Sequence, residues 1–142
     1  MSIVLGFDFG MKHIGVAVGQ ALTKTATPLT EVKAKDGIPN FEDIRLLIEE
    51  WEPAALIVGI PLNMDGTEQH STHAARKFAK RLKAKFKLDV FEVDERLSSW
   101  EAKHRIKDRI KEGQTKHEES IHSVAAVVLV EEWLNTPPAP DT

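Results

Sequence analysis

The segment most informative about the fold is Ile3-Val4-Leu5-Gly6-Phe7-Asp8-Phe9-Gly10, and Ile14-Gly15-Val16-Ala17-Val18-Gly19 follows it closely. A continuous apolar run predicts a strand buried on both faces. Gly10 permits a tight turn, so the second segment returns as a neighbouring strand with small residues. Asp8 interrupts the first run, and a buried carboxylate is unfavourable unless a cation, a metal or hydrogen-bond donors neutralise it. Because the small neighbours leave room for a ligand, we interpret Asp8 as functional; the alternative is a core aspartate satisfied by backbone amides or by Lys12.

Size and composition indicate one globular domain. The chain has 142 residues, of which 42% are hydrophobic and 29% charged, and its formal net charge is −3. A chain of this length buries about two thirds of its unfolded surface. The absence of cysteine excludes disulfides and thiolate metal sites and suits a reducing compartment. No apolar stretch reaches about 18 residues, so we expect neither a membrane span nor a secretory signal.

The rest of the pattern predicts a mixed α/β fold. We expect a third strand over residues 25–32, which Pro28 confines to an edge or splits, and a loop over residues 33–39. Further strands are expected over residues 54–60 and 88–93, and helices after Asn40, over residues 68–87, after Ser98 and over residues 120–134. This order predicts a five-stranded mixed sheet with helices on both faces, in one domain over residues 1–134. Residues 135–142 are predicted to form a disordered tail.

Polar residues follow the predicted strands at their carboxyl ends, where ligand sites form in open α/β sheets. Glu95 joins Asp8 if their two strands are neighbours, and paired carboxylates without thiolates suit Mg²⁺ or Mn²⁺. Alternation along the strand places Asp94 and Glu95 on opposite faces, and the sequence leaves open which of them is the ligand. The alternative role for Glu95 is a salt bridge to Arg96 or Arg76, or a charge at a helix start.

Basic residues gather in two segments. Residues 76–87 hold seven Lys or Arg and no acid, and residues 103–116 hold six with only two acids. On the long predicted helix they alternate with the core residues, so they are expected to form one outward band. Both a solvated helix face and a local site for a polyanion fit this pattern.

Three motifs, in this order, resemble those of the bacterial YqgF family, also called RuvX. They are Phe7-Asp8-Phe9-Gly10 with the glycine-rich residues 14–19, the run over residues 58–69, and Asp94-Glu95-Arg96-Leu97-Ser98. The resemblance covers nearly the whole chain except the tail. It implies an RNase H-like fold similar to that of the Holliday-junction resolvase RuvC, and a cytoplasmic nuclease that matures the 5′ end of precursor 16S rRNA. It also implies Asp8 and Glu95 as metal ligands.

The chain departs from the family in the third acidic position. Where the family usually has Asp-Ser at the start of the final helix, this chain reads Ile121-His122-Ser123. The resemblance therefore gives His122 the place of the third catalytic residue and metal ligand. A neutral imidazole ligates Mn²⁺ or a softer ion but is a poor ligand for Mg²⁺. Glu118, one helical turn earlier, lies on the same helical face and offers a carboxylate; alternatively, His122 is an ordinary helix-start residue.

The reaction that the resemblance implies is phosphodiester hydrolysis with Mg²⁺ or Mn²⁺ as cofactor. Asp8, Glu95 and His122 would be the catalytic residues and metal ligands. The residues expected to position the nucleic-acid backbone without reading its sequence are Lys12, Arg76, Lys80, Arg96, Lys103 and Arg105. The expected partner is RNA, namely precursor 16S rRNA, or branched DNA, and no membrane.

Three other functions remain open from the sequence. A Holliday-junction resolvase has the same fold, but it requires a homodimer that places two sites on opposite strands. The chain would be a non-catalytic nucleic-acid-binding module if the replacement of the third acid by His122 has removed the third metal ligand. An ATP-dependent kinase of the actin-like fold also combines Asp-x-Gly with a glycine-rich hairpin, but such enzymes usually need two copies of this domain.

Overall fold

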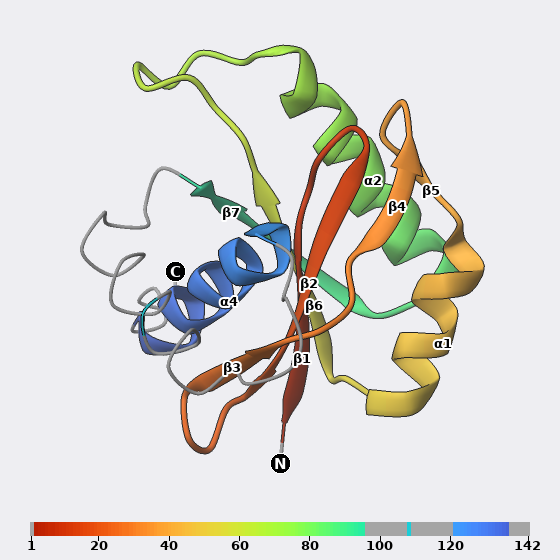
Figure 1. The fold of residues 1–142 in the computed structure, drawn as a ribbon, viewed down its shortest axis with the longest axis vertical. Helices are drawn as coiled ribbons and strands as arrows, with labels where there is room; N and C mark the ends of the chain where they lie inside the picture. Colours follow the sequence, from red (N-terminus) through yellow and green to blue (C-terminus); the bar gives the residue numbers. More distant parts are fainter. Residues whose placement is uncertain (1, 96–107, 109–120, 137–142) are drawn as a thin grey trace.

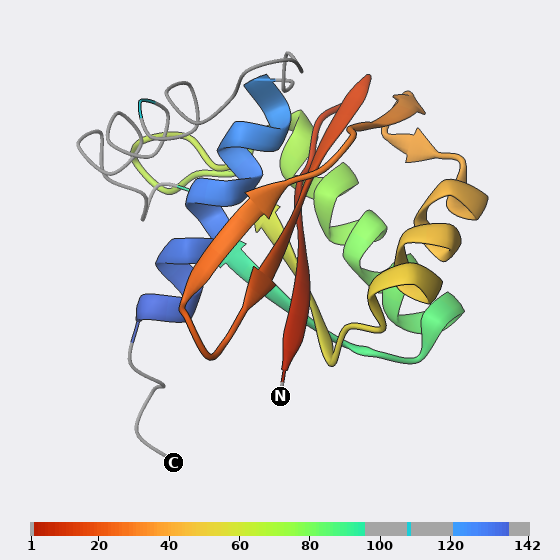
Figure 2. The same ribbon diagram turned by 60° about the horizontal axis from the view of Figure 1, so that its bottom comes forward.

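The structure is a computed structural model of the chain, and it describes residues 2–95, 108 and 121–136. A mixed sheet lies in the middle, with α1 and α2 on one face and α4 on the other (Figure 1 and Figure 2). The described elements are β1 (Ile3–Asp8), β2 (His13–Gln20), β3 (Thr25–Pro28), β4 (Val32–Lys35), β5 (Ile38–Pro39), α1 (Phe41–Trp51), β6 (Ala55–Ile60), α2 (His70–Phe86), β7 (Asp89–Asp94) and α4 (Ile121–Asn135). None of the helices in these ranges is long and apolar enough to cross a membrane.

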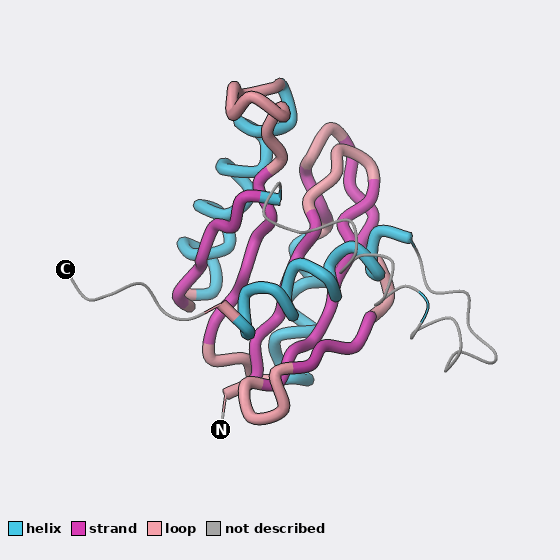
Figure 3. Tube along the Cα trace, turned by 90° about the vertical axis from the view of Figure 1, so that its left-hand side faces the viewer, coloured by secondary structure: helices cyan, strands magenta, loops and turns pink. Residues whose placement is uncertain are grey.

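The order of the strands brings three carboxyl ends together. The sheet runs β5-β4-β2-β1-β6-β7, and β3 also pairs with β2. β1 is antiparallel to β2 and parallel to β6, and β6 is parallel to β7. Figure 3 shows these strands side by side between the two helix layers. The carboxyl ends of β1, β6 and β7 therefore meet at one edge of the sheet, and this edge positions the candidate site.

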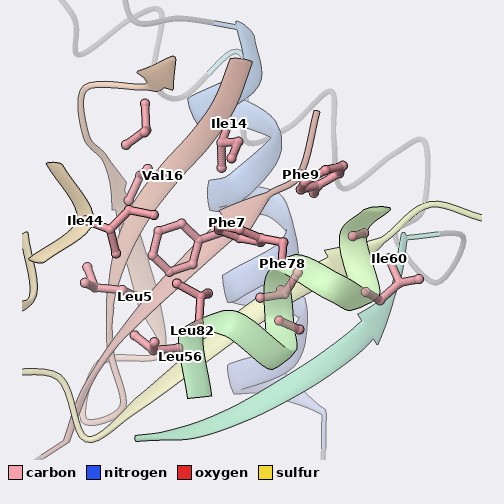
Figure 4. Packing of buried hydrophobic residues seen from close by; sticks show 14 of the residues in the cluster. Leu5, Phe7, Phe9, Ile14, Val16, Ile44, Leu56, Ile60, Phe78 and Leu82 are labelled. Carbon is pink, nitrogen blue, oxygen red and sulfur yellow. The ribbon is translucent and has the colours of Figure 1, made fainter. Parts of the chain in front are cut away.

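Two hydrophobic clusters join the helices to the sheet. The larger lies between the sheet and α1 and α2, and the rings of Phe7 and Phe78 meet edge-on there with centroids 5.7 Å apart (Figure 4). The second lies under α4 and includes Val4 and Val130. Successive strand residues point to opposite faces, so Phe7 faces α2 whereas Val4 and Gly6 face α4. Gly6 has no side chain because a Cβ atom there would collide with Val130.

Local signals set the ends of the first helix as predicted. Asn40 is the N-cap of α1, and its side chain accepts a hydrogen bond of 3.0 Å from the backbone N–H of Glu42. The helix ends at Trp51, because Glu52 adopts a left-handed conformation with a φ of 46° and Pro53 follows. The strand predicted over residues 54–60 then appears as β6.

Residues 25–39 differ from the prediction. Pro28 ends β3, so the expected third strand is split into β3 and β4. The expected loop over residues 33–39 is wrong, because β4 and β5 pair as a hairpin across Asp36-Gly37. Both turn residues have a positive φ, 53° and 80°, as a two-residue turn with Asp-Gly requires. The sheet therefore has seven strands rather than five, and the mixed α/β architecture is as predicted.

The C-terminal boundary also moves. Asn135, predicted as the first residue of the tail, belongs to α4. Its side-chain amide donates to the carbonyl oxygens of Glu131, at 2.8 Å, and Lys24, at 3.2 Å, and so ties the helix end to the end of the loop before β3. Residues 137–142 and, apart from residue 108, the helix predicted after Ser98 lie outside the described residues.

Candidate active site

Asp8 is the last residue of a central strand. It lies opposite Gly15 of antiparallel β2 and Gly59 of parallel β6, so neither neighbour in the sheet carries a side chain beside it. Strand alternation places Asp8 on the same face as Val4 and Gly6, which is the face covered by α4. The half-buried carboxylate of Asp8 is thus directed to the α4 side of the carboxyl edge.

Glu95 reaches the same face from the end of β7. Gly59 pairs with Val93 two residues before Glu95. An ideal Cβ atom on Gly59 would lie 2.8 Å from Oε1 of Glu95 and 2.8 Å from Cδ2 of Leu129 in α4. The Glu95 carboxylate therefore lies over Gly59, directly beside the strand that ends in Asp8, and paired strands are only about 4.8 Å apart. The absence of a side chain at position 59 is what opens this space.

Oε1 of Glu95 is buried and accepts no hydrogen bond from any described residue. A carboxylate oxygen in such a position has lost water without a replacement donor, which is unfavourable by several kcal/mol. A cation is the group that offsets this cost most directly. The donor set of Asp8 and Glu95 is all oxygen, which Mg²⁺ and Mn²⁺ prefer.

Asp94 is directed away from this pair. It pairs with Ile60 in β6, and alternation gives it the face opposite to that of Val93. Val93 packs with the cluster under α4, whereas Val90, on the same side as Asp94, packs with the cluster under α2. Of the two neighbouring acids, Glu95 is therefore the one on the same face as Asp8.

The backbone of His122 lies at the Asp8 end of the sheet. It belongs to the first turn of α4, and the next residue, Ser123, is buried with its hydroxyl oxygen 3.4 Å from the backbone N–H of Val16. Val130, farther along α4, contacts Gly6, so the helix runs away from Asp8. The His122 side chain lies outside the description. Among the described side chains, no group of three or more His, Cys, Asp or Glu is placed to share a metal ion.

The candidate nucleic-acid-binding residues do not form one band. Lys12 is exposed in the turn between β1 and β2, close in sequence to Asp8. Arg76 and Lys80 lie on α2, which covers the other face of the sheet. Arg76 is already paired, because it donates a hydrogen bond of 2.7 Å to Glu68 and its Nε lies 3.9 Å from a carboxylate oxygen of Glu92.

Three further candidates, Arg96, Lys103 and Arg105, lie outside the described residues. On α2, the expected single outward band of basic residues divides into two rows. One row, with Arg76, faces β7, and the other, with Lys77 and Arg81, lines a cavity beside the β4–β5 hairpin. The two rows cannot be separated from the sequence, because helical periodicity alone does not tell which neighbours flank the two sides of a helix.

Known proteins resemble the chain along nearly its full length. The family sequence model described as "RuvX: Holliday junction resolvase" matches residues 2–136. A protein of Shewanella oneidensis named "Putative pre-16S rRNA nuclease" is 53% identical over 135 residues, which cover 92% of each chain. A protein of Coxiella burnetii with the same name is 51% identical over 132 residues, covering 93% of this chain and 92% of its own.

Solved structures identify the architecture. The RuvC structure of Thermus thermophilus aligns with a TM-score of 0.61 at 14% identity, covering 93% of each chain. The same enzyme in complex with a Holliday junction substrate aligns with a TM-score of 0.59 at 15% identity, covering 94% of each chain. At such identities the likeness concerns the fold, which is that of the RNase H-like resolvases. With the family match over residues 2–136, the chain belongs to the RuvX family of Holliday junction resolvase-like nucleases.

Proposed function

We propose that the chain is a divalent-metal-dependent endonuclease and that its substrate is precursor 16S rRNA. The observation that carries the metal dependence is the buried Oε1 of Glu95, which accepts no hydrogen bond from the described residues and lies over Gly59 beside Asp8. A folded protein tolerates such an atom where a cation completes its coordination.

Asp8 and Glu95 would hold the metal, and His122 would complete the ligand set from the first turn of α4. A divalent ion held there would lower the pKa of a water molecule and stabilise negative charge on the phosphate. Hydrolysis would form one bond between the water oxygen and phosphorus and break the bond to the leaving 3′ oxygen, which takes up a proton. Lys12, exposed in the turn after β1, would hold the phosphate by charge without reading the base.

The names of the relatives support RNA as the substrate, since two proteins more than 50% identical to the chain are named for precursor 16S rRNA. Action on a ribosomal RNA precursor would place the chain in the cytoplasm of a bacterium. The family description favours a second candidate, a Holliday-junction resolvase acting on branched DNA. That reaction requires two sites on opposite strands and therefore a homodimer.

The decisive experiment compares cleavage of two labelled substrates with Mg²⁺ and with Mn²⁺. One is an RNA that spans the 5′ end of 16S rRNA in its precursor, and the other is a four-way DNA junction. We expect cleavage of the RNA, and Asp8→Asn and Glu95→Gln to lower its rate at least about a hundredfold. Asp94→Asn is the matched control and should cleave like the wild type, because Asp94 is on the other face.

Equal rates for Asp8→Asn, Glu95→Gln and the wild type would contradict a metal site at this pair. Cleavage of the junction alone, by a protein that sediments as a dimer, would replace the RNA substrate by branched DNA. If the protein cleaves neither substrate with either metal, the result would favour the non-catalytic binding module.

His122 predicts a preference between metals. Imidazole is a better ligand for Mn²⁺ than for Mg²⁺, so the wild type should be faster with Mn²⁺. His122→Asp should move the preference toward Mg²⁺, and His122→Ala should lower the rate with both metals. If all three proteins show the same ratio of rates with the two metals, His122 is not a ligand.

A further inference from the structure

A small cavity lies between α2 and the turn that joins β4 to β5. Its volume is about 220 Å³, which is below the roughly 300 Å³ at which pockets for whole small molecules begin. We name it the α2 pocket; on the helix side it is lined by His70, His73, Lys77 and Arg81, and on the other side by Met11 and Gly37. A space of this size suits one small polar group rather than a nucleotide.

The helix side of the α2 pocket is basic. His70, His73, Lys77 and Arg81 follow one another at intervals of three or four residues, so they form a single row along one side of α2. Lys77 and Arg81 are exposed and form no ion pair within the described parts of the chain. Arg76 on the same helix differs, because Glu68 and Glu92 offset its charge.

Two carboxylates lie near this row, but the net charge around the pocket remains positive. Asp36 lines the pocket, and Glu68 contacts His73 with 3.0 Å between Oε1 and Nε2. Glu68 is at the same time engaged by Arg76. Lys77 and Arg81 together therefore outweigh Asp36 at the pocket, and both cations remain available to an anion.

The opposite wall is formed by a turn that requires glycine. Gly37 has a φ of 80°, and a Cβ atom on it would lie 3.0 Å from the Phe9 ring and 3.4 Å from Cβ of Ala74 in α2. The backbone N–H of Gly37 donates a hydrogen bond of 2.9 Å to the carbonyl oxygen of Met11. The β4–β5 turn is thus fixed close to the helix and to the turn that follows β1, so the pocket is built into the fold.

The β1–β2 turn links the α2 pocket to the candidate active site, because it follows Asp8 directly and contributes Met11 to the pocket. Met11 lines the pocket and follows Asp8 by three residues, so their Cα atoms are at most about 11 Å apart. Since phosphates of one strand of a duplex are spaced about 3.4 Å along its axis, a backbone that crosses this span presents more than one phosphate to it. Exposed Lys12 lies between the two places in sequence. A nucleic-acid backbone that crosses this turn can reach both.

We propose that the α2 pocket binds a backbone phosphate of the nucleic-acid substrate, away from the bond that is cleaved. The inference rests on the proposed nuclease function and adds a second anchoring point to it. Lys77 and Arg81 supply the charge, and the imidazole of His70 supplies a further hydrogen-bond donor, whereas His73 already contacts Glu68. Such a contact fixes the register of the strand at the active site and carries no information on base sequence.

The test measures binding without cleavage. Fluorescence anisotropy of a labelled 20-nucleotide single-stranded RNA is recorded in EDTA at several salt concentrations, with the full chain. We expect Lys77→Gln combined with Arg81→Gln to weaken binding about tenfold. The slope of log K against log salt should fall by about 1 for each removed contact, equally for RNAs of different sequence. Lys83→Gln, on the same helix but outside the pocket, is the matched control and should bind like the wild type.

A second pair of variants tests the cavity rather than the charge of the helix. Ile38, 51% exposed, lines the pocket from the hairpin, and Leu46, 52% exposed, lies on α1. Ile38→Glu should weaken binding severalfold, because its carboxylate repels the phosphate, and Leu46→Glu should leave binding unchanged. The inference is overturned if the Lys77 and Arg81 variant binds like the wild type, or if either control weakens binding as much as its partner. Because this assay measures binding in EDTA and needs no cleavage, its result can be interpreted even if the nuclease proposal fails.

Discussion

Oε1 of Glu95 lies 2.8 Å from the point that a side chain on Gly59 would occupy. The position of the Glu95 carboxylate, at the end of β7, thus depends on the absence of a side chain at Gly59 in the neighbouring strand β6. Leu129 of α4 borders the same point at 2.8 Å, so an added methyl group would meet a carboxylate and a helix at once. This dependence makes Gly59 the backbone position that sets the candidate active site.

Gly59→Ala should therefore displace Glu95 and lower metal-dependent RNA cleavage at least about tenfold, with a stability loss of about 1–3 kcal/mol from overpacking. Gly6→Ala is the matched control, because its Cβ atom would collide with Val130 on the same face, whereas Glu95 is not among its nearest neighbours. It should lose similar stability in urea unfolding and keep its cleavage rate. Equal rates for the two variants would refute a specific role for Gly59.

Glu131 holds the short strand β3 to α4. It is buried, with 8% of its surface exposed, and its Oε2 accepts a hydrogen bond of 2.8 Å from the backbone N–H of Ala26. Glu131→Ala leaves that donor without its acceptor and should lower the free energy of unfolding by about 1–3 kcal/mol. Glu131→Gln keeps an acceptor oxygen and should lose less. Urea unfolding checks the order, and equal losses would show that the hydrogen bond contributes little.

Phe78 is the aromatic centre of the cluster under α2. It is fully buried and contacts the rings of Phe7 and Phe9 (Figure 4) and that of Phe41. Phe78→Ala should lower the free energy of unfolding by about 3–5 kcal/mol.

The matched control is Phe91→Ala. Phe91 is 43% exposed on β7, and its ring centroid lies 5.4 Å from that of Trp133. Its removal should lower the free energy of unfolding by about 1 kcal/mol. Comparable losses of unfolding free energy for Phe78→Ala and Phe91→Ala would contradict the conclusion that Phe78 lies in the core and Phe91 at the surface.

Stability should fall in acid partly through Glu68. The hydrogen bond from Arg76 lowers the pKa of the Glu68 carboxyl from its ordinary value of 4.5. A carboxyl whose pKa is lowered by folding stabilises the protein above its unfolded pKa, and this contribution is lost as the pH falls through the folded pKa. The urea midpoint should therefore decrease below about pH 4.5 less steeply in Glu68→Gln and in Arg76→Gln than in the wild type. If the urea midpoint of both variants depends on pH as that of the wild type does, the Glu68–Arg76 pair does not contribute to the loss of stability in acid.

Strong local patterns predicted most of the fold, and packing decided the rest. The apolar run around Phe7 forms β1, the buried strand that the pattern predicts, and Asn40 caps α1 as expected. Asp36-Gly37 was interpreted as a loop signal although the same dipeptide also forms two-residue hairpin turns, so β5 was missed. The split of the predicted strand over residues 25–32 followed from Pro28, which the sequence had indicated as one of two outcomes.

The candidate site was predictable in its residue types but not in its geometry. Strand alternation predicts that Asp94 and Glu95 point to opposite faces of the sheet. Which face each takes is shown only by the packing of Val93 in the cluster under α4 and by the position of Leu129 of α4 beside Gly59. The two basic rows of α2 likewise depend on which strands flank the helix. These are tertiary facts that neither periodicity nor spacing contains.

The most direct measurement is a crystal structure of the wild-type chain with Mn²⁺, with the ion located by its anomalous scattering. We expect an anomalous peak within ligand distance of carboxylate oxygens of both Asp8 and Glu95, and no such peak in Glu95→Gln crystals treated in the same way. The metal site proposed here is wrong if Mn²⁺ binds elsewhere in the wild-type structure while Glu95 Oε1 accepts hydrogen bonds from donors of the protein itself.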